Sequence, residues 1–480
     1  MNARASGRLP LLFILASLFA GDLIATSRPN VIFLLADDMR ADVIAALGNS
    51  HVQTPNLDRL VARGTSFTRA YIMGGLQGAV CVPSRAMMLS GRPLFRISEH
   101  LKETTTWPMV FRAAGYETFG CGKWHNGGPS YAASFPNGKT VFLGGMSDNF
   151  RVAVRDVTAG GTLTPPRTNT VHSSELFAGQ AIEFLRAQRG GTNPFALYVA
   201  FTAPHDPRQA PKEFRARYDA AKLALPKNFL PKHPFNNGEL TVRDEQLLPW
   251  PRTEAAVRNE LADYYAILTH LDTQIGRVLE TLREIGRAEE TIVVFAADNG
   301  LALGSHGLLG KQNVYEHSMR VPLIVSGPGL PADRRTAAMC YLFDLFPTLC
   351  DMAGLKTPAS VQGRSLMAVL KGEKEDHRDA ILTAYRHYQR AVNDGHFKLI
   401  RYAHINKTQL FDLQNDPQEL RDLSADAAAK PRLDGLMARL TVLQKEFGDG
   451  LALTTDSPAP LEIPLPPVGK KSKKTGKKNA

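Results

Sequence analysis

The stretch Val31-Ile32-Phe33-Leu34-Leu35-Ala36-Asp37-Asp38 contains six apolar residues without alternation, followed at once by two carboxylates. A run of this kind predicts a strand that is buried on both faces, as in a parallel sheet covered by helices on its two sides. Four further runs of the same kind occupy residues 116–121, 195–201, 291–297 and 321–326. We therefore expect a central, mainly parallel sheet in which residues 31–36 form one strand.

Helical patterns lie between these runs. The clearest covers roughly residues 253–285, where Leu261, Tyr264 and Leu268 begin a series of apolar residues at steps of three or four, and Gly286 ends it. Alternating strands and helices predict the α/β class, with a large mixed, mainly parallel sheet sandwiched by helices. We assign this architecture to a catalytic domain over residues 28–375.

The pattern changes after about residue 376. The expected elements are a hairpin over 390–402 that turns at Asn393-Asp394-Gly395, a strand over 409–413 and a closing helix over 431–447. These elements predict a smaller C-terminal antiparallel-sheet subdomain over residues 376–455. Before them, residues 207–251 are rich in proline and only weakly periodic, which predicts a long functional loop on the substrate side.

Polar side chains follow four of the predicted strands. In chain order they are Asp37 and Asp38, Lys123 and His125, His205, and Asp298 and Asn299. Open α/β sheets bind ligands beyond the carboxyl ends of their strands, so we expect these side chains to share one edge. The carboxylate and amide oxygens suit calcium, or magnesium with its stricter geometry, whereas no Cys/His cluster has the spacing of a zinc site. A helix cap is the alternative explanation for Asp37-Asp38 taken alone.

Cys81 opens the run Cys81-Val82-Pro83-Ser84-Arg85-Ala86-Met87-Met88-Leu89-Ser90-Gly91-Arg92. Pro83 suits the first position of a helix and Gly91 suits its end, so the thiol is expected just ahead of a two-turn helix, in the positive field of the N-terminus. Arg85 can reach back toward the same point. The combination predicts a centre that handles anions, although a buried cysteine at an ordinary helix start is the alternative.

The sequence Cys-x-Pro-Ser-Arg followed by Leu-Ser-Gly-Arg resembles the signature of the type I, formylglycine-dependent sulfatases of the alkaline phosphatase-like superfamily. Further stretches are similar to other landmarks of that family: residues 28–32 leading to Asp37-Asp38, residues 54–60, Gly122-Lys123-Trp124-His125, Pro204-His205 and Gly310-Lys311. The resemblance implies that Cys81 is oxidised before folding to formylglycine (3-oxoalanine) by a formylglycine-generating maturation enzyme.

The resemblance also implies a role for each site residue. It implies that a calcium ion, or less readily magnesium, is held by Asp37, Asp38, Asp298, Asn299 and the modified residue 81. It implies that Lys123, His205 and Lys311 bind the sulfate oxygens, and that Arg85 and His125 hold the formylglycine. A metal ion polarises the sulfate, and fixed lysines stabilise charge without reorganising in the transition state.

The family mechanism requires the aldehyde hydrate, because one of its hydroxyls attacks sulfur and the other, once deprotonated, expels sulfate by C–O cleavage. We expect His125 to be the base for this second step, and His205 or Lys311 to protonate the departing alcohol. A structural role is the alternative for each lone histidine, and for His306 the sequence leaves loop structure and substrate contact equally open.

The expected reaction is hydrolysis of a sulfate ester, with a sulfated carbohydrate favoured over choline sulfate or an aryl sulfate. A phosphomonoester or phosphonate hydrolase of the same superfamily is an alternative, because the metal and anion pocket would accept phosphate. Two other classes stay open: a binding protein with a decayed site, and a thiol hydrolase that uses Cys81 unmodified. The latter needs a histidine and an orienting partner dedicated to the thiol.

Composition and the two ends of the chain bear on location and partners. Arg4 and Arg8 precede the apolar run 9–20, so residues 1–27 predict a signal peptide and an exported protein, periplasmic or secreted; an uncleaved anchor is the alternative. No other run is long enough to span a bilayer, so an integral membrane protein is not expected. Four cysteines in a chain of this size do not require a structural disulfide framework.

The net charge of +11 is concentrated at one end. Six lysines lie between residues 470 and 480, behind a proline-rich stretch, so we expect residues 456–480 to form a disordered Pro/Lys-rich tail. Without that tail and the leader, the folded part carries about +4. No clustered basic surface with groove-reading elements is evident, so nucleic acid is not an expected partner.

Overall fold

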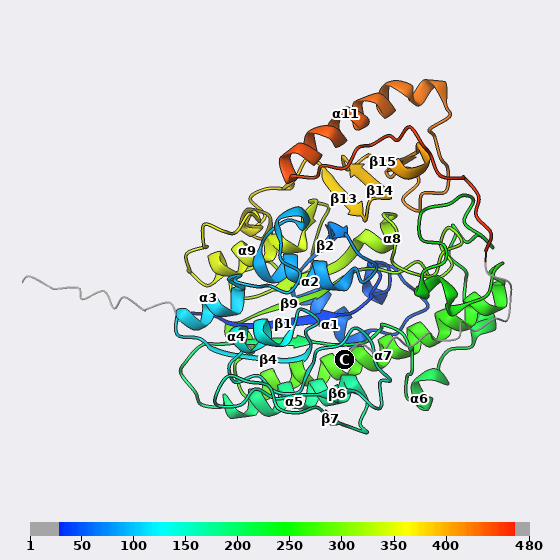
Figure 1. Cartoon of the computed structure of the whole chain (residues 1–480). Coiled ribbons are helices and arrows are strands. Elements are labelled where there is room, and N and C mark those ends of the chain that lie inside the picture. Colours follow the sequence, from blue (N-terminus) through cyan, green and yellow to red (C-terminus); the bar gives the residue numbers. More distant parts are fainter. Residues whose placement is uncertain (1–27, 466–480) are drawn as a thin grey trace, which may run out of the picture.

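A nine-stranded sheet forms the centre of the molecule in the computed structural model, which describes residues 28–465 (Figure 1). Its strands follow the order β11 (Arg334–Thr336), β2 (Thr65–Tyr71), β10 (Arg320–Ser326), β9 (Thr291–Ala297), β1 (Asn30–Ala36), β8 (Phe195–Ala200), β4 (Glu117–Lys123) and β5 (Val141–Phe142), and β12 (Cys340–Tyr341) pairs with β2. The five apolar runs of the sequence form β1, β4, β8, β9 and β10, as predicted.

Most neighbouring strands of this sheet are parallel. β1 pairs in parallel with β8 on one side and β9 on the other, whereas β10 runs antiparallel to both β9 and β2. Every residue of β1 is buried because helices cover both faces of the sheet. The mixed, mainly parallel sheet confirms the predicted α/β class.

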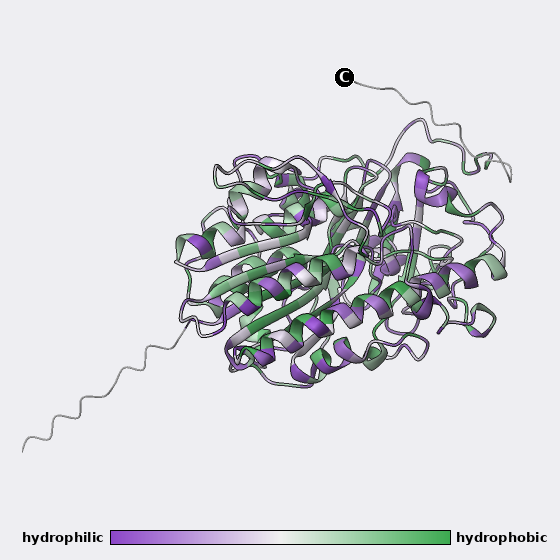
Figure 2. Cartoon of the chain, turned by 90° about the horizontal axis from the view of Figure 1, so that it is seen from below, coloured by the Kyte–Doolittle hydropathy of each residue, from purple (hydrophilic) through white to green (hydrophobic). Residues whose placement is uncertain are grey.

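Helices form the two outer layers. Their bounds are α1 (Pro55–Arg63), α2 (Cys81–Ser90), α3 (Trp107–Ala113), α4 (Gly128–Ser134), α5 (Ser173–Ala187), α6 (Lys212–Arg215), α7 (Glu254–Glu284), α8 (Glu316–Met319), α9 (Leu345–Met352), α10 (Met367–Leu370) and α11 (Lys430–Phe447). Helices α1, α5 and α6 pack on α7 on one side of the sheet, and α2 packs with α3 and α9 on the other (Figure 1). Figure 2 shows the consequence in hydropathy, with hydrophobic strands inside and helices that are polar on one side.

The long helix α7 has the ends that its sequence predicts. The Thr253 hydroxyl accepts a hydrogen bond from the N–H of Ala256 (3.3 Å), which satisfies one of the free donors of the first turn. Gly286 adopts a φ of +76°, a left-handed conformation that ends a helix and that glycine adopts without strain.

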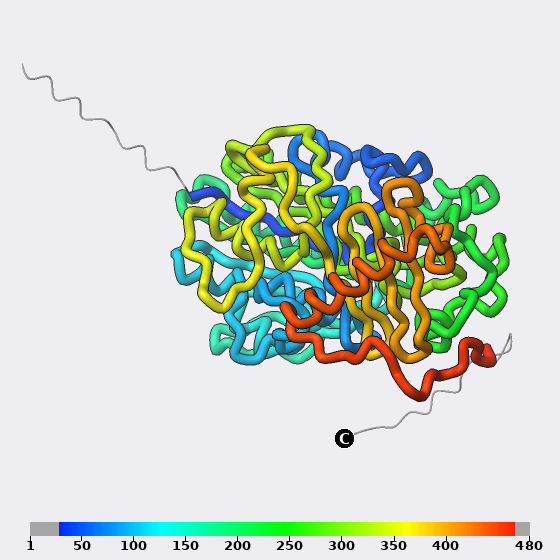
Figure 3. Tube along the Cα trace, turned by 90° about the horizontal axis from the view of Figure 1, so that it is seen from above, coloured from blue at the N-terminus to red at the C-terminus, as the bar shows by residue number. Residues whose placement is uncertain are grey.

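A second sheet of five strands lies over the end of the central sheet. Its order is β16 (Lys407–Asp412), β15 (Phe397–Tyr402), β14 (Gln389–Asn393), β13 (Ile381–Tyr385) and β3 (Gly74–Gly75), and α11 crosses it (Figures 1 and 3). The predicted hairpin, strand and closing helix correspond to β14–β15, β16 and α11. The sequence did not predict β3, which joins β13 in parallel and so ties this sheet to the segment just before α2. A two-stranded ribbon of β6 (Ala153–Val154) and β7 (Arg167–Thr168) completes the strands.

The C-terminal stretch departs from the prediction of disorder from residue 456 onward. Residues 456–465 have no regular secondary structure, yet the N–H of Ala459 donates to the His404 carbonyl (2.8 Å) and the Leu461 carbonyl accepts from Asn236 (2.7 Å). These backbone hydrogen bonds hold the stretch against the second sheet and the loop at 236 (Figure 3). The rest of the predicted tail, 466–480, and the predicted signal peptide, 1–27, lie outside the described residues. Within residues 28–465, none of the helices combines the length and apolar character that crossing a membrane requires.

Candidate active site

Two carboxylates and an amide meet where β1 and β9 end. Because these strands pair in register to their last residues, Asp37 and Asp38 leave the sheet beside Asp298 and Asn299. The N–H of Asp38 donates to Asp298 Oδ1 (3.2 Å), and Asn299 Nδ2 donates to Asp38 Oδ1 (2.7 Å). All four side chains are buried. The structure thus brings together the residues that the sequence places after the first and fourth predicted strands.

The backbone at this edge is tightly constrained. Asp38 has a φ of +64°, which turns the chain sharply after β1. Gly300 follows Asn299, and a Cβ at this position would lie 2.1 Å from the carbonyl oxygen of His317. Glycine is therefore required in Asp298-Asn299-Gly300 by the close approach of another backbone segment.

Cys81 is the first residue of α2, so the helix begins two residues earlier than Pro83 suggested. Arg85, one turn later, points into the site, where its Nε donates to Asp298 Oδ2 (2.8 Å) and another nitrogen donates to the Lys123 carbonyl (2.6 Å). Sγ of Cys81 and carboxylate oxygens of Asp37 and Asp298 all lie within 4.8 Å of one another. The guanidinium therefore fixes a carboxylate that faces the thiol.

Lys123 and His125 approach the thiol from the end of β4. Lys123 Nζ lies 3.9 Å from Sγ of Cys81, pairs with Asp37 and donates to the Gly145 carbonyl (2.6 Å). His125 Nδ1 lies 3.2 Å from the same sulfur. Both side chains thus face residue 81, although His125 has a φ of +70° and is not in an extended strand.

His205 and Lys311 reach the site through Asp38. Lys311 Nζ donates to Asp38 Oδ1 (2.6 Å), and His205 Nε2 lies 3.7 Å from Asp38 Oδ2. Lys311 and His205 therefore both face the carboxylate of Asp38, while Lys123 contacts the carboxylate of Asp37. All predicted site residues converge on a single centre.

The oxygen donors of this centre fit a hard divalent cation. Asp37 Oδ1 and Asn299 Oδ1 are buried and have no hydrogen-bond partner among the described residues. Burying a polar atom without a hydrogen-bond partner costs free energy, so these two unpartnered oxygens indicate that a ligand binds to them. Carboxylate and amide oxygens are donors that calcium prefers.

Burial and mutual repulsion shape the charges of the acids. Burial and the neighbouring charge of Asp37 raise the pKa of Asp298 to about 6, against the opposing guanidinium of Arg85. At Asp38 burial also disfavours the charged form, but His205 and Lys311 outweigh it and lower the pKa below its usual range. A divalent cation would offset the excess of negative charge at this edge.

The thiol and its histidine neighbour are poorly suited to a thiol hydrolase. Burial raises the pKa of Cys81, although Lys123 and Lys311 oppose it. Burial, with the nearby cations Lys123 and Arg85, lowers the pKa of His125 to about 2. A neutral thiol beside a neutral imidazole is the opposite of the ion pair that activates a cysteine nucleophile.

Some residues took other roles or escaped prediction. His306 Nε2 contacts the Glu419 carbonyl (2.9 Å) and its ring stacks on Tyr315 at 4.0 Å, so it holds loop structure rather than facing the site. The sequence did not indicate the contact of Gly145 with Lys123. No local pattern marks a carbonyl that serves in this way.

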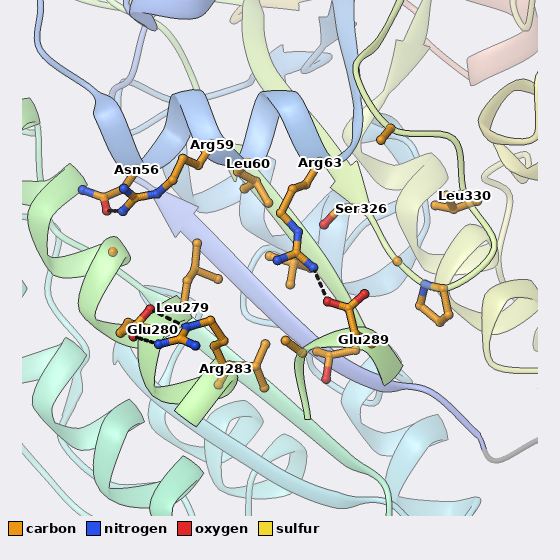
Figure 4. Close-up of a pocket in the computed structure, with 18 of the residues that line it drawn as sticks. Asn56, Arg59, Leu60, Arg63, Leu279, Glu280, Arg283, Glu289, Ser326 and Leu330 are labelled. Carbon is orange, nitrogen blue, oxygen red and sulfur yellow. Dashed lines mark hydrogen bonds and ion pairs between the residues drawn. The ribbon is translucent and has the colours of Figure 1, made fainter. Parts of the chain in front are cut away.

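A cavity lies away from these residues, between α1, α7 and the N-terminal end of β9 (Figure 4). It has a volume of about 760 Å³. Four of its charged side chains pair with one another, Arg63 with Glu289 at 2.7 Å and Arg283 with Glu280 at 2.5 Å, and the fifth, Arg59, donates to the amide oxygen of Asn56. Because these pairs are exposed and self-satisfied, the cavity offers no comparable set of free donors.

Comparison with known proteins gives a consistent result. The family model described as Sulfatase matches residues 29–355, and the model described as N-sulphoglucosamine sulphohydrolase, C-terminal, matches residues 304–446. The N-acetylglucosamine-6-O-sulfatase of Bacteroides thetaiotaomicron is 26% identical over 505 residues, which cover 88% of each chain. The arylsulfatase of Clostridium perfringens is 28% identical, covering 85% of this chain and 93% of the relative.

The fold has close counterparts among solved structures. A protein solved in complex with its substrate D-glucosamine-2-N,6-O-disulfate is similar with a TM-score of 0.74 and 24% identity, over 88% of this chain and 99% of the other.

Proposed function

Because this chain belongs to the sulfatase family and hydrolyses sulfuric esters, we propose that it cleaves a sulfate ester of a carbohydrate with a formylglycine made from Cys81 and a calcium ion. The observation that carries the proposal is the position of Sγ of Cys81. Sγ and carboxylate oxygens of Asp37 and Asp298 all lie within 4.8 Å of one another, and His125 Nδ1 lies 3.2 Å from Sγ. An anion bound beside Sγ would lie next to cationic side chains and also next to carboxylic acids.

The metal and the modified residue have defined places in this proposal. Asp37, Asp38, Asp298 and Asn299 would hold the calcium ion together with residue 81, and the two unpartnered oxygens support this set. When bound, the cation supplies a Lewis acid that polarises the sulfate and lowers the pKa of a bound hydroxyl. The formylglycine supplies, as its hydrate, a nucleophile that can release sulfate again.

The chain's own residues bind and orient the anion. Lys123 and Lys311 have fixed ammonium groups beside the thiol and Asp38, where they would bind sulfate oxygens and stabilise the charge that develops as the S–O bond breaks. Arg85 keeps Asp298 in place through a hydrogen bond of 2.8 Å. His125 presents Nδ1 3.2 Å from residue 81 and is the base that we propose, because the negative charge of a bound sulfate would offset the cations that, together with burial, lower its pKa.

His205 and Lys311 are the two candidates for delivering a proton to the departing alcohol. Nδ1 of His205 contacts the Asp206 carbonyl (2.7 Å), which fixes the proton on that nitrogen and leaves Nε2 directed toward Asp38. Burial and Lys311 keep its pKa near 4 even though Asp38 opposes them. A neutral ring with its proton on Nδ1 has none to give from Nε2, so Lys311, whose ammonium group contacts the same carboxylate at 2.6 Å, is the donor that we favour.

A sugar sulfate is the substrate class that the relatives favour. One relative is named for 6-O-sulfated N-acetylglucosamine, and the second matched family model is that of N-sulphoglucosamine sulphohydrolase. Choline sulfate, aryl sulfates and phosphate or phosphonate monoesters are the competing substrates.

The test is a substrate screen with natively matured protein. Sulfated mono- and oligosaccharides, choline sulfate, an aryl sulfate and the matched aryl phosphate are incubated with one preparation, and the position of desulfation is determined by mass spectrometry. The proposal predicts the highest kcat/KM on a sugar sulfate. A preference for the aryl phosphate would contradict it.

We also propose that the protein is exported to the periplasm or the medium and that a formylglycine-generating enzyme modifies it before folding. The charged and apolar pattern of residues 1–27 supports export, and the Cys81–Arg85 signature supports the modification. Sequencing the N-terminus of protein recovered from each cellular fraction tests the location. Full-length protein retained in the cytoplasm would contradict it.

A further inference from the structure

The loop that carries Lys311 is anchored by a buried carboxylate from a distant part of the chain. Glu245 lies in the short helix η4 (Arg243–Leu247), within the proline-rich segment 207–251. Its carboxylate accepts hydrogen bonds from the N–H of Leu309 (3.0 Å) and of Gly310 (2.8 Å), the two residues before Lys311. Hydrogen bonds to an ionised carboxylate are among the stronger ones in proteins.

Glu245 is itself held rigidly. Arg252 donates to its carboxylate (2.8 Å) and to its carbonyl (2.7 Å), and the guanidinium of Arg252 lies 3.5 Å from the ring centroid of Trp250. Glu245 and Arg252 are both buried. A carboxylate fixed in this way presents its oxygens to the Lys311 loop in a single position.

The neighbouring residue holds the other side of the same loop. Asp244 Oδ2 accepts from Gln312 Nε2 (2.8 Å), and Gln312 Oε1 in turn accepts from the N–H of Lys311 (3.0 Å). The packing leaves no room at Gly310, where a Cβ would lie 2.2 Å from Gln312 Oε1. Residues on both sides of Lys311 are therefore tied to η4.

Arg243, the first residue of η4, contacts the residue that follows His205, which is another candidate ligand of the sulfate. Arg243 pairs with both carboxylate oxygens of Asp206, one of them at 3.0 Å, and also with Asp244 (2.9 Å). Asp206 follows His205 and contacts its Nδ1 through the carbonyl at 2.7 Å. Arg243, Asp244 and Glu245 thus contact residues that are adjacent in sequence to His205 and to Lys311.

We propose that Arg243, Asp244 and Glu245, the 243–245 clamp, position Lys311 and His205 against the sulfate group, an inference that rests on the function proposed above. None of the three contacts the thiol or its acids, so they are positioning residues. The Lys311 ammonium stabilises the negative charge that develops in the transition state only when it lies at the right distance from it. A small displacement of this group therefore weakens the stabilisation.

A double-mutant cycle tests the clamp. In Glu245→Gln the new NH₂ group must face either the N–H groups of Leu309 and Gly310 or the guanidinium of Arg252, so the loop before Lys311 is held less firmly in both orientations. We expect kcat/KM to fall about 10- to 100-fold in the otherwise unsubstituted enzyme. In the Lys311→Ala background the same change should cost less than about twofold, because no ammonium remains to be misplaced.

A matched carboxylate far from the loop provides the control. Asp449 is buried and accepts from Arg390 at 2.6 and 2.9 Å, but it lies in the segment after α11. Asp449→Asn should lower stability, and any loss of kcat/KM should be the same with and without Lys311. If Glu245→Gln also costs the same factor in both backgrounds, Glu245 merely supports the fold and the clamp is overturned.

Two further measurements keep the test decisive. If Glu245→Gln does not fold, Arg243→Met serves, since this side chain is 44% exposed, and its cycle is run against His205→Ala. If Lys311→Ala leaves too little turnover, the cycle is determined from the affinity of the metal-loaded enzyme for inorganic sulfate, measured by calorimetry. Failure of the unsubstituted enzyme to cleave any sulfate ester contradicts the proposed function, whereas equal losses in an active enzyme contradict the clamp alone.

Discussion

The molecule holds charged side chains in two very different ways at the two ends of its central sheet. At the carboxyl ends of β1 and β9, Asp37, Asp298 and Arg85 are almost inaccessible, with side chains no more than 1% exposed. At the opposite end, in the cavity of Figure 4, Arg63 and Glu289 are 55% and 90% exposed. Both regions contain close ion pairs.

The difference shows why size and charge alone do not identify a site. In the cavity each charge meets its opposite in water, where an ion pair contributes little. At the carboxyl ends of β1 and β9, which we call the catalytic edge, the charges are kept out of water at considerable cost in free energy, and two oxygens still lack partners among the described residues. These two oxygens indicate that a ligand completes the site, and for this reason we place the proposed chemistry here rather than in the cavity.

The largest expected effect comes from the residue at the focus of the catalytic edge. Cys81→Ala leaves no sulfur or oxygen on Cβ from which an aldehyde can form, so kcat should fall by at least about 10³-fold. Circular dichroism should show an unchanged fold, because alanine fits in the space that cysteine occupies. Activity within tenfold of the unsubstituted enzyme would contradict the role of residue 81.

A smaller but still large effect is expected from a single acid of the catalytic edge. Asp298→Asn removes one charge from the proposed calcium ligands and weakens the contact with Arg85, so bound calcium should be lost and kcat should fall about 10²- to 10³-fold. Metal content is measured by atomic emission on the purified variant. Full calcium content would remove Asp298 from the ligand set.

Chelation tests the same edge without a substitution. Removing the cation should abolish turnover and lower Tm, because a ligand present at 100 times its Kd stabilises the folded state by about 2.7 kcal/mol. Calcium should restore both properties. If the chelated protein keeps its activity and Tm, the unpartnered oxygens do not hold a cation.

The smallest effect is expected in the cavity of Figure 4. Glu289→Gln breaks the pair with Arg63, yet the free energy of unfolding should change by no more than about 0.5 kcal/mol, and kcat/KM should not change. This variant is the control for Asp298→Asn, since each removes one carboxylate charge from an arginine pair. A loss of activity in Glu289→Gln would contradict the conclusion that the ion pairs of the cavity have no role in the reaction.

The sequence predicted the catalytic edge well because its signals are local. Unbroken apolar runs such as 31–36 mark strands covered on both faces, and the residue after each run falls at the functional edge by topology alone. The strands β2 and β3 were missed because Thr65–Tyr71 contains polar residues and Gly74–Gly75 is too short to show a pattern.

Contacts between distant segments could not be predicted in this way. Nothing in the local sequence around Glu245 indicates that its carboxylate lies on the loop before Lys311, 64 residues away. The same holds for residues 456–465, whose proline-rich composition suggested disorder although their backbone pairs with His404 and Asn236. Composition describes what a segment can do alone, whereas these segments are ordered by partners elsewhere in the fold.

The central claim is that residue 81 acts as an aldehyde beside a divalent ion. Its most direct test is mass analysis of the peptide that contains residue 81, from natively produced protein whose turnover of a sugar sulfate is measured in the same sample. We predict the mass of formylglycine or its hydrate, in a proportion that follows the specific activity across preparations. An unmodified cysteine in fully active enzyme would contradict the account.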